Sequence, residues 1–199
     1  MTTEPLQERV TESRVIEQRG LYFDELEEDV VYAHRPGRTV TEADNVLFTT
    51  MTMNTQALHL DAAWSAGQPF GQRVMNSMFT LATVVGQSVP QLTQGTIIAQ
   101  LGLTDVSFPH PMYHGDTLYT ETAVTGKRLS SSRPGQGIVT MKHTGRNQHG
   151  EVVALATRSC LMWTRDAHTA AQQAHPPGNN PEQANTAQKE RAARGRIDS

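Results

Sequence analysis

Asn54 and His59 lie five residues apart, and Asp61 follows two residues later. An unperturbed imidazole has a pKa near working pH, so a neutral His59 could take a proton from a bound water molecule. The amide of Asn54 could orient that water but cannot act as a base. A lone histidine also commonly caps a helix or fills a polar gap, and Asp61 fits equally well as the first residue of a helix. The spacing alone leaves both interpretations open, a water-binding pair or ordinary structural residues.

A second candidate group is the pair Asn76-Ser77, which opens an apolar run. The first backbone amides of a helix have no partner within the helix, and they lie at the positive end of its dipole. Aimed at a thioester oxygen, such amides could stabilise an enolate, as the donors of an oxyanion hole do. Ordinary capping explains the same residues without chemistry, and residue types alone favour capping.

Helical signals surround both candidate groups. Thr41 and Asp44 have the spacing of a capping box, and apolar residues at helical spacing then predict a short helix to about residue 52. A helical turn is predicted at 61–65. The run 74–85 is apolar almost all round, so we predict a buried helix there that ends at Gly86.

The second half of the chain has the alternating pattern of strands. We predict strands at 96–107, 118–128, 137–146 and 152–163, and a short earlier strand that ends at 30–32. Cys160 falls within the last strand, which indicates a core residue rather than a nucleophile. A buried helix followed by four long, mostly antiparallel strands predicts an α+β fold in which a sheet curls round the helix.

Composition limits the class of protein. The formal net charge is −3 with no basic block, so nothing points to nucleic acid, and no apolar run reaches the ~18 residues of a membrane span. One cysteine excludes an internal disulfide, and the polar amino terminus lacks the apolar core of a signal peptide. We therefore expect a cytoplasmic protein.

The 199 residues suffice for one domain with tails. We predict a polar extension at 1–19, a single domain at 20–165 and a tail at 166–199. The tail is rich in Gln, Ala, Asn and Pro and nearly devoid of large apolar residues, so we predict that it is disordered.

Three segments arrive in the order and spacing of a known family: GRTVTEADNVLFTTMTMNTQALHLDAAW, FGQRVMNSMFTLA and VSFPHPMYHGDTLY. From about Gly20 to Trp163 the chain resembles the MaoC-like, or (R)-specific enoyl-CoA hydratase, family. The resemblance implies a single hot-dog fold, in which an antiparallel sheet wraps a long central helix, and assembly into a homodimer or higher homo-oligomer. The first segment is similar to the branch of mesaconyl- and itaconyl-CoA hydratases, whose substrates are short, branched and acidic.

The family's hydratase motif places an Asp and a His five residues apart as the water-binding pair. His59 stands at the motif's His, whereas Asn54 stands where the family has Asp. Ser77 stands where the family has the glycine whose amide binds the thioester oxygen. The change at Asn54 leaves three outcomes: His59 acts alone, another acid such as Asp61 substitutes, or hydration is lost.

The resemblance implies a hydro-lyase that adds water to a short, branched or dicarboxylic 2-enoyl-CoA such as mesaconyl- or itaconyl-CoA, or removes it. We assign catalysis to His59 as the base, Asn54 as the water-positioning amide and the backbone amide of Ser77 as the oxyanion donor. We assign substrate binding to a set around them: Asp61, Phe70, Gly71, Arg73 and Asn76. Coenzyme A is part of the substrate, and we expect no cofactor, no metal, no nucleic acid and no membrane.

Two alternatives stay open. A hot-dog thioesterase would usually use a carboxylate to activate water, and Asn54 is not one. A non-catalytic acyl-CoA-binding protein or partner subunit fits the loss of the motif's Asp.

Overall fold

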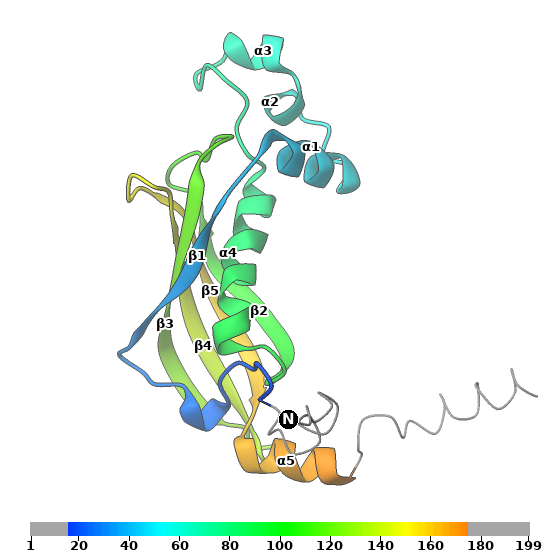
Figure 1. The fold of residues 1–199 in the computed structure, drawn as a ribbon, viewed down its shortest axis with the longest axis vertical. Helices are drawn as coiled ribbons and strands as arrows, with labels where there is room; N and C mark the ends of the chain where they lie inside the picture. Colours follow the sequence, from blue (N-terminus) through cyan, green and yellow to red (C-terminus); the bar gives the residue numbers. More distant parts are fainter. Residues whose placement is uncertain (1–15, 175–199) are drawn as a thin grey trace, which may run out of the picture.

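A five-stranded sheet carries a long helix on one face in the computed structural model, which describes residues 16–174 (Figure 1). The strands are β1 (Val31–Thr39), β2 (Ile97–Ser107), β3 (Thr117–Leu129), β4 (Gln136–Arg146) and β5 (Val152–Trp163), and their order in the sheet is β1-β3-β4-β5-β2. Every neighbouring pair is antiparallel. The α+β class and the four long strands predicted from the alternating pattern are confirmed.

The helices gather at the two ends and along one face of this sheet. They are α1 (Glu42–Met51), α2 (Ala57–Leu60), α3 (Ala62–Ala66), α4 (Ser77–Leu92) and α5 (Arg165–Ala174), with a 3-10 turn η1 (Phe23–Glu25) before β1. Helices α1 to α3 project beyond the sheet where α4 begins, and α5 lies at the opposite end (Figure 1). None of the helices within residues 16–174 is long and apolar enough to cross a membrane.

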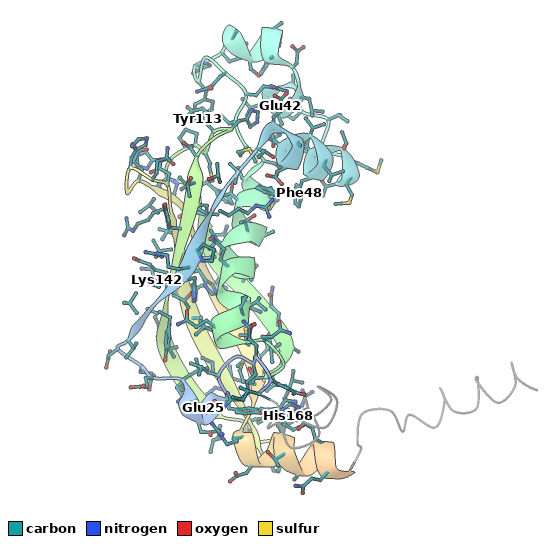
Figure 2. The ribbon with its side chains drawn as sticks, viewed as in Figure 1. Glu25, Glu42, Phe48, Tyr113, Lys142 and His168 are labelled. Carbon is teal, nitrogen blue, oxygen red and sulfur yellow. The ribbon has the colours of Figure 1, made fainter. Side chains whose placement is uncertain are left out.

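Helix α1 begins at the predicted capping box. The Thr41 hydroxyl accepts a hydrogen bond from the amide of Asp44, and the Asp44 carboxylate accepts one from the amide of Thr41. The Phe48 ring of this helix meets the Phe79 ring of α4 edge to face, with centroids 5.6 Å apart. Figure 2 shows Phe48 on the side of α1 that faces α4. The cap and the aromatic contact together fix α1 above the start of α4.

Helix α4 buries one face against the sheet and leaves the other open. Its buried residues recur at every fourth position: Thr80, Val84, Ser88 and Leu92. On β4, a Cβ added to Gly145 would lie 2.5 Å from a Val84 methyl group, so a glycine there lets the helix approach the strand. The opposite face carries exposed Met78, Ala82 and Gly86. The prediction of a helix buried all round is wrong.

The predicted end of this helix is also wrong. The helix passes Gly86 and contains Pro90 before it stops at Leu92. Gly86 lies on the exposed face, where a helical glycine costs only about 1 kcal/mol relative to alanine and does not force an end.

Two other predicted boundaries differ from the structure. The early strand does not end at 30–32, because β1 begins at Val31, and its pairing with β3 shifts register between His34 and Arg38. The predicted disordered tail is wrong for 166–174, where α5 continues the chain. His168 of α5 stacks on the Trp163 ring and contacts the Tyr22 hydroxyl at 3.1 Å. The rest of the tail and residues 1–15 lie outside the described residues.

The core between α4 and the sheet has an apolar cluster at each end. One contains Leu26, Leu92, Val124, Val139, Met141, Cys160 and Met162, and the other Val40, Met75, Val84, Met112, Leu118, Val153 and Ala154. Cys160 is fully buried, which confirms it as a core residue, and burial raises the pKa of its thiol.

A chain of polar side chains, buried at His34, Thr122 and His143, separates the two clusters. His34 bonds Gln91 at 2.8 Å through Nδ1 and Thr122 at 2.8 Å through Nε2, and the Thr122 hydroxyl also meets Nδ1 of His143 at 2.8 Å. Burial lowers the pKa of His34, and burial with the nearby Arg158 lowers the pKa of His143 to about 3. Both rings are therefore neutral near pH 7, and the fold depends on their staying so.

Candidate active site

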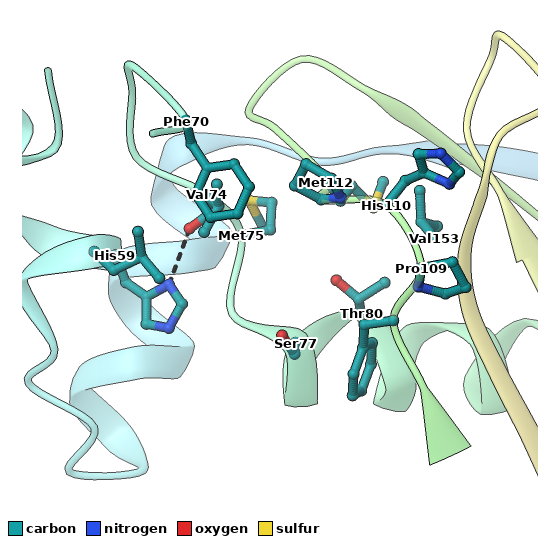
Figure 3. A pocket seen from close by; sticks show the side chains of 13 residues that line it. His59, Phe70, Val74, Met75, Ser77, Thr80, Pro109, His110, Met112 and Val153 are labelled. Carbon is teal, nitrogen blue, oxygen red and sulfur yellow. Dashed lines mark hydrogen bonds between the residues drawn. The ribbon is translucent and has the colours of Figure 1, made fainter. Parts of the chain in front are cut away.

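A pocket of about 310 Å³ lies where α4 begins (Figure 3). It is enclosed by α2, the loop after α3, the start of α4, the loop between β2 and β3, and the start of β5. Its lining residues are Leu58, His59, Phe70, Val74, Met75, Ser77, Thr80, Phe108, Pro109, His110, Pro111, Met112 and Val153. These thirteen residues include no carboxylate, and the polar side chains among them are His59, Ser77, Thr80 and His110.

The structure fixes the orientation of the His59 ring. His59 is 7% exposed, and its Nδ1 lies 3.0 Å from the carbonyl oxygen of Val74 (Figure 3). A carbonyl oxygen can only accept, so Nδ1 carries the proton of the neutral ring. Nε2 is then the unprotonated nitrogen and can receive a proton from a water molecule in the pocket.

The amino end of α4 supplies the donors predicted there. Asn76 is the cap, and its side-chain oxygen accepts from the amide of Met78 at 2.9 Å. The Ser77 amide, at the first helical position, receives no hydrogen-bond partner from residues 16–174. Ser77 lines the same pocket as His59, so the base and the residue that carries the free helix amide belong to one cavity.

Asn45 of α1 connects these two groups, and no role was predicted for it from the sequence. It is fully buried, and its Nδ2 reaches the backbone oxygens of His59 at 3.1 Å and Val74 at 3.2 Å. Its Oδ1 accepts from the amide of Asn76 at 2.8 Å. One side chain thus holds the backbone of the base, the carbonyl that orients its ring and the cap of α4. The sequence contains a weak indication of this role: asparagine is unfavourable inside a predicted helix unless its side-chain amide has hydrogen-bond partners.

The structure does not bring Asn54 into the pocket. The chain leaves α1 through Met53, whose φ is 58°, and the exposed Asn54 side chain accepts from the amide of Gln56 at 3.3 Å. Asp61 is also exposed and caps α3, accepting from the amide of Trp64 at 2.9 Å. Neither lines the pocket. Their assigned roles therefore stay predictions, without support from the geometry.

The other residues assigned to substrate binding divide in the same way. Phe70 lines the pocket and is 45% exposed. Gly71, with φ of 67°, turns the loop beside it but does not line the cavity. Arg73 forms an ion pair with Glu42, which lowers the pKa of that carboxyl, and does not line the cavity either. Asn76 is buried and acts as the helix cap.

Histidine, cysteine and carboxylate side chains do not gather into a metal site in the described part of the chain. Within residues 16–174, no three of them lie close enough together to hold an ion.

Comparison with known proteins identifies the family. The family model described as a MaoC like domain matches residues 25–147, more than half of the chain. The chain belongs to the MaoC-like domain family. Among its relatives, the β-methylmalyl-CoA dehydratase of Chloroflexus aurantiacus is 29% identical over 76% of this chain and 43% of its own length. The mesaconyl-CoA hydratase of Haloarcula marismortui is 29% identical over 75% of this chain and 42% of its own length.

The solved structures agree on the architecture. A Mycobacterium tuberculosis protein described as having a double hot-dog fold matches with a TM-score of 0.66 and 26% identity, over 75% of this chain and 46% of that one. The hot-dog fold expected from the sequence is thereby confirmed for this MaoC-like domain. The chain spans less than half the length of each of these three proteins.

Proposed function

We propose that this MaoC-like domain is a hydro-lyase that adds water to the double bond of a short 2-enoyl-CoA, or removes it in the reverse direction. The observation that carries the proposal is the shared cavity of His59 and Ser77, in which the Val74 carbonyl leaves Nε2 of the base unprotonated. The hydratase and dehydratase relatives support the same reaction class.

In the proposed mechanism, Nε2 of His59 takes a proton from water as the water oxygen bonds to C3. The electron pair of the double bond moves toward the thioester carbonyl, and the Ser77 amide stabilises the oxygen of the resulting enolate. The imidazolium then returns a proton to C2, so that one water has been added across the bond. The chain needs no cofactor for these steps. With Asn54 outside the cavity, His59 acts as the single base.

Pocket size and charge favour a short, acidic acyl group. About 310 Å³ is small for a ligand cavity, which suits an acyl group of few carbons. The absence of a carboxylate among the thirteen lining residues avoids repulsion of an anionic acyl group. We therefore propose mesaconyl-CoA, or a branched C5 isomer such as itaconyl-CoA, as the substrate. The same absence disfavours the thioesterase, which would usually use a carboxylate to activate water.

We also propose that the chain assembles into a cytoplasmic homodimer. Strand β2 ends the sheet and carries Leu101, which is 51% exposed, and the open face of α4 carries Met78, which is 50% exposed. Open edge strands and exposed apolar patches are typical of protein interfaces. The double hot-dog protein, of which this chain covers 46%, supports a second hot-dog unit beside the first.

The test is a spectrophotometric assay of enoyl absorbance with mesaconyl-CoA, run with the wild-type chain and with His59→Ala. We expect wild-type turnover and a fall in kcat of about 100-fold or more in the variant, as for the loss of a general base. An unaffected variant would refute the mechanism. Release of free CoA, detected with a thiol reagent, would instead indicate the thioesterase, and tight binding of the ester without turnover would indicate a binding protein.

A further inference from the structure

The pocket has a second histidine, to which neither the sequence nor the proposed mechanism gives a role. His110 lies in the loop between β2 and β3 and lines the same cavity as His59. Figure 3 shows its ring beside Val153 and Pro109, across the pocket from His59. The two rings therefore lie on different walls of one cavity.

His110 is held by a stiff piece of backbone. Pro109 and Pro111 flank it, and proline fixes its own φ and restricts the residue before it to extended conformations. Its Nδ1 also lies 3.2 Å from the carbonyl oxygen of Val152 at the start of β5. Although the side chain is exposed, its position is set in advance, as expected of a group that binds a ligand.

The Val152 contact determines which nitrogen is available. The carbonyl can only accept, so it holds the Nδ1 proton, and Nε2 is left for a ligand. In the neutral ring this Nε2 is an acceptor, as in His59, so it binds a carboxylate only when the ring is protonated, and the negative charge of a bound carboxylate favours that form. Nε2 is then a charged donor, and charge-assisted hydrogen bonds to a carboxylate are about twice as strong as neutral ones.

The charges around His110 favour an anion. Among the residues that line the cavity, His59 and His110 are the titratable ones. Glu151 immediately precedes β5, and its carboxylate accepts from the side-chain amide of Asn147 at 2.7 Å. An anionic group that reaches Nε2 of His110 therefore has no competing carboxylate among the lining residues.

We propose that His110 is the specificity-determining residue of this pocket and that it binds the terminal carboxylate of a short dicarboxylic acyl group through Nε2. The inference rests on the proposed function for the identity of the ligand as an acyl-CoA. It adds the reason why an acidic acyl chain would be preferred over a neutral one of the same length.

Binding of two saturated esters tests this assignment without requiring turnover. Succinyl-CoA and butyryl-CoA have acyl chains of equal length that end in a carboxylate and a methyl group, and neither has the double bond that a hydratase needs. The variant is His110→Asn, whose amide can still donate to the Val152 carbonyl but has no atom at the position of Nε2. His110→Phe serves as a second variant, and His149→Asn in the β4–β5 turn is the matched control.

Isothermal titration should give a Kd for succinyl-CoA that rises about tenfold or more in both His110 variants, because a charge-assisted hydrogen bond is lost. The Kd for butyryl-CoA should stay within about twofold, and His149→Asn should change neither value. Equal weakening of both esters would mean that His110 contacts the coenzyme A phosphates or holds the loop, and no weakening would mean that it binds nothing. Either result overturns the assignment. If the proposed hydratase function is wrong, the enoyl assay fails while the difference between the two saturated esters persists.

Discussion

The side chain of Asn45 connects groups that the proposed reaction requires to be correctly placed relative to one another. It bonds the backbone at His59, Val74 and Asn76 without itself lining the cavity. Asn45 is therefore a positioning residue, and its loss should affect geometry rather than chemistry.

Replacement of Asn45 by alanine should lower stability by about 1–3 kcal/mol, since it leaves buried carbonyl groups without partners. It should also lower kcat by about tenfold or more, because small displacements of catalytic groups are costly. The matched control is Asn147→Ala. That residue is 5% exposed and accepts from the amides of His149 and Glu151 in a turn that does not line the pocket. Urea denaturation should show a loss of stability in both variants, whereas an equal loss of kcat in both would contradict the positioning role.

Ser77 allows the oxyanion donor to be removed selectively. It is the first residue of α4, where proline is well tolerated, and Asn76 before it has ψ of 125°, the extended conformation that a following proline requires. Ser77→Pro should therefore delete the amide hydrogen without breaking the helix. We expect kcat to fall about 10²–10³-fold, the usual effect of losing one oxyanion donor.

Ser77→Ala is the control for this prediction, because it keeps the amide and removes only the hydroxyl. In steady-state kinetics with the enoyl-CoA, the kcat of Ser77→Ala should stay within about threefold of the wild-type value. This change is much smaller than the one caused by losing an oxyanion donor. Matching rates for the proline and alanine variants would exclude the amide from catalysis.

At the scale of the elements, the polar chain between α4 and the sheet makes stability depend on pH. An unfolded histidine titrates near pH 6.5, whereas the folded pKa of His143 is about 3. Between these values the unfolded chain binds more protons than the folded one, so stability is complete above pH 6.5 and declines as the pH falls toward 3. Since His34 also has a lowered pKa, it should add to this loss.

Urea midpoints measured at pH 7.5 and 5.0 should show that His143 alone contributes a loss of about 2 kcal/mol, at 1.36 kcal/mol for each unit of pKa difference expressed. His143→Asn keeps a donor for the Thr122 hydroxyl and removes the titration. It should be less stable than the wild type at pH 7.5 but lose less on acidification. If the variant loses as much stability between pH 7.5 and 5.0 as the wild type does, His143 does not cause the acid sensitivity.

Local patterns predicted the elements that local interactions determine. The cap of α1 depends on Thr41 and Asp44, three residues apart, and the strands β3 to β5 alternate because one face packs against α4. The end of α4 was predicted wrongly because Gly86 and Pro90 lie on its exposed face. The opposite face packs against the sheet, and those contacts keep the helix intact. The place of β1 was missed because its sequence contains Pro36 and its pairing shifts register beside that proline.

The candidate site was predicted only in part for a related reason. His59 and Ser77 could be found from the motif, and the structure brings both into one cavity. Asn45 and His110 could not, because their contacts join residues far apart in the sequence, such as Asn45 with Asn76 or His110 with Val152. Asn54 stands at a position of the motif, and yet its side chain does not line the pocket.

At the scale of the whole molecule, the open edge of β2 predicts how two copies meet. Lysine on an edge strand opposes pairing with another strand, so Leu101→Lys should convert the proposed dimer into a monomer. Leu129→Lys is the control, because Leu129 is 63% exposed at the end of β3, which lies between β1 and β4 in the sheet and does not neighbour β2. Light scattering after gel filtration measures the mass. A dimeric Leu101→Lys variant, or a monomeric wild type, would contradict an interface at β2.

The bonds of Asn45 also have a consequence for how the molecule gains its activity during folding. They join α1 to residues 14, 29 and 31 positions further along the chain, and contacts between distant residues form late because the intervening loops must close first. Helices such as α1 can form in microseconds from local interactions alone. In a refolding experiment, the far-ultraviolet helix signal should therefore return before turnover does. Recovery of turnover would then mark the step at which α1 forms its hydrogen bonds with the backbone at His59, Val74 and Asn76.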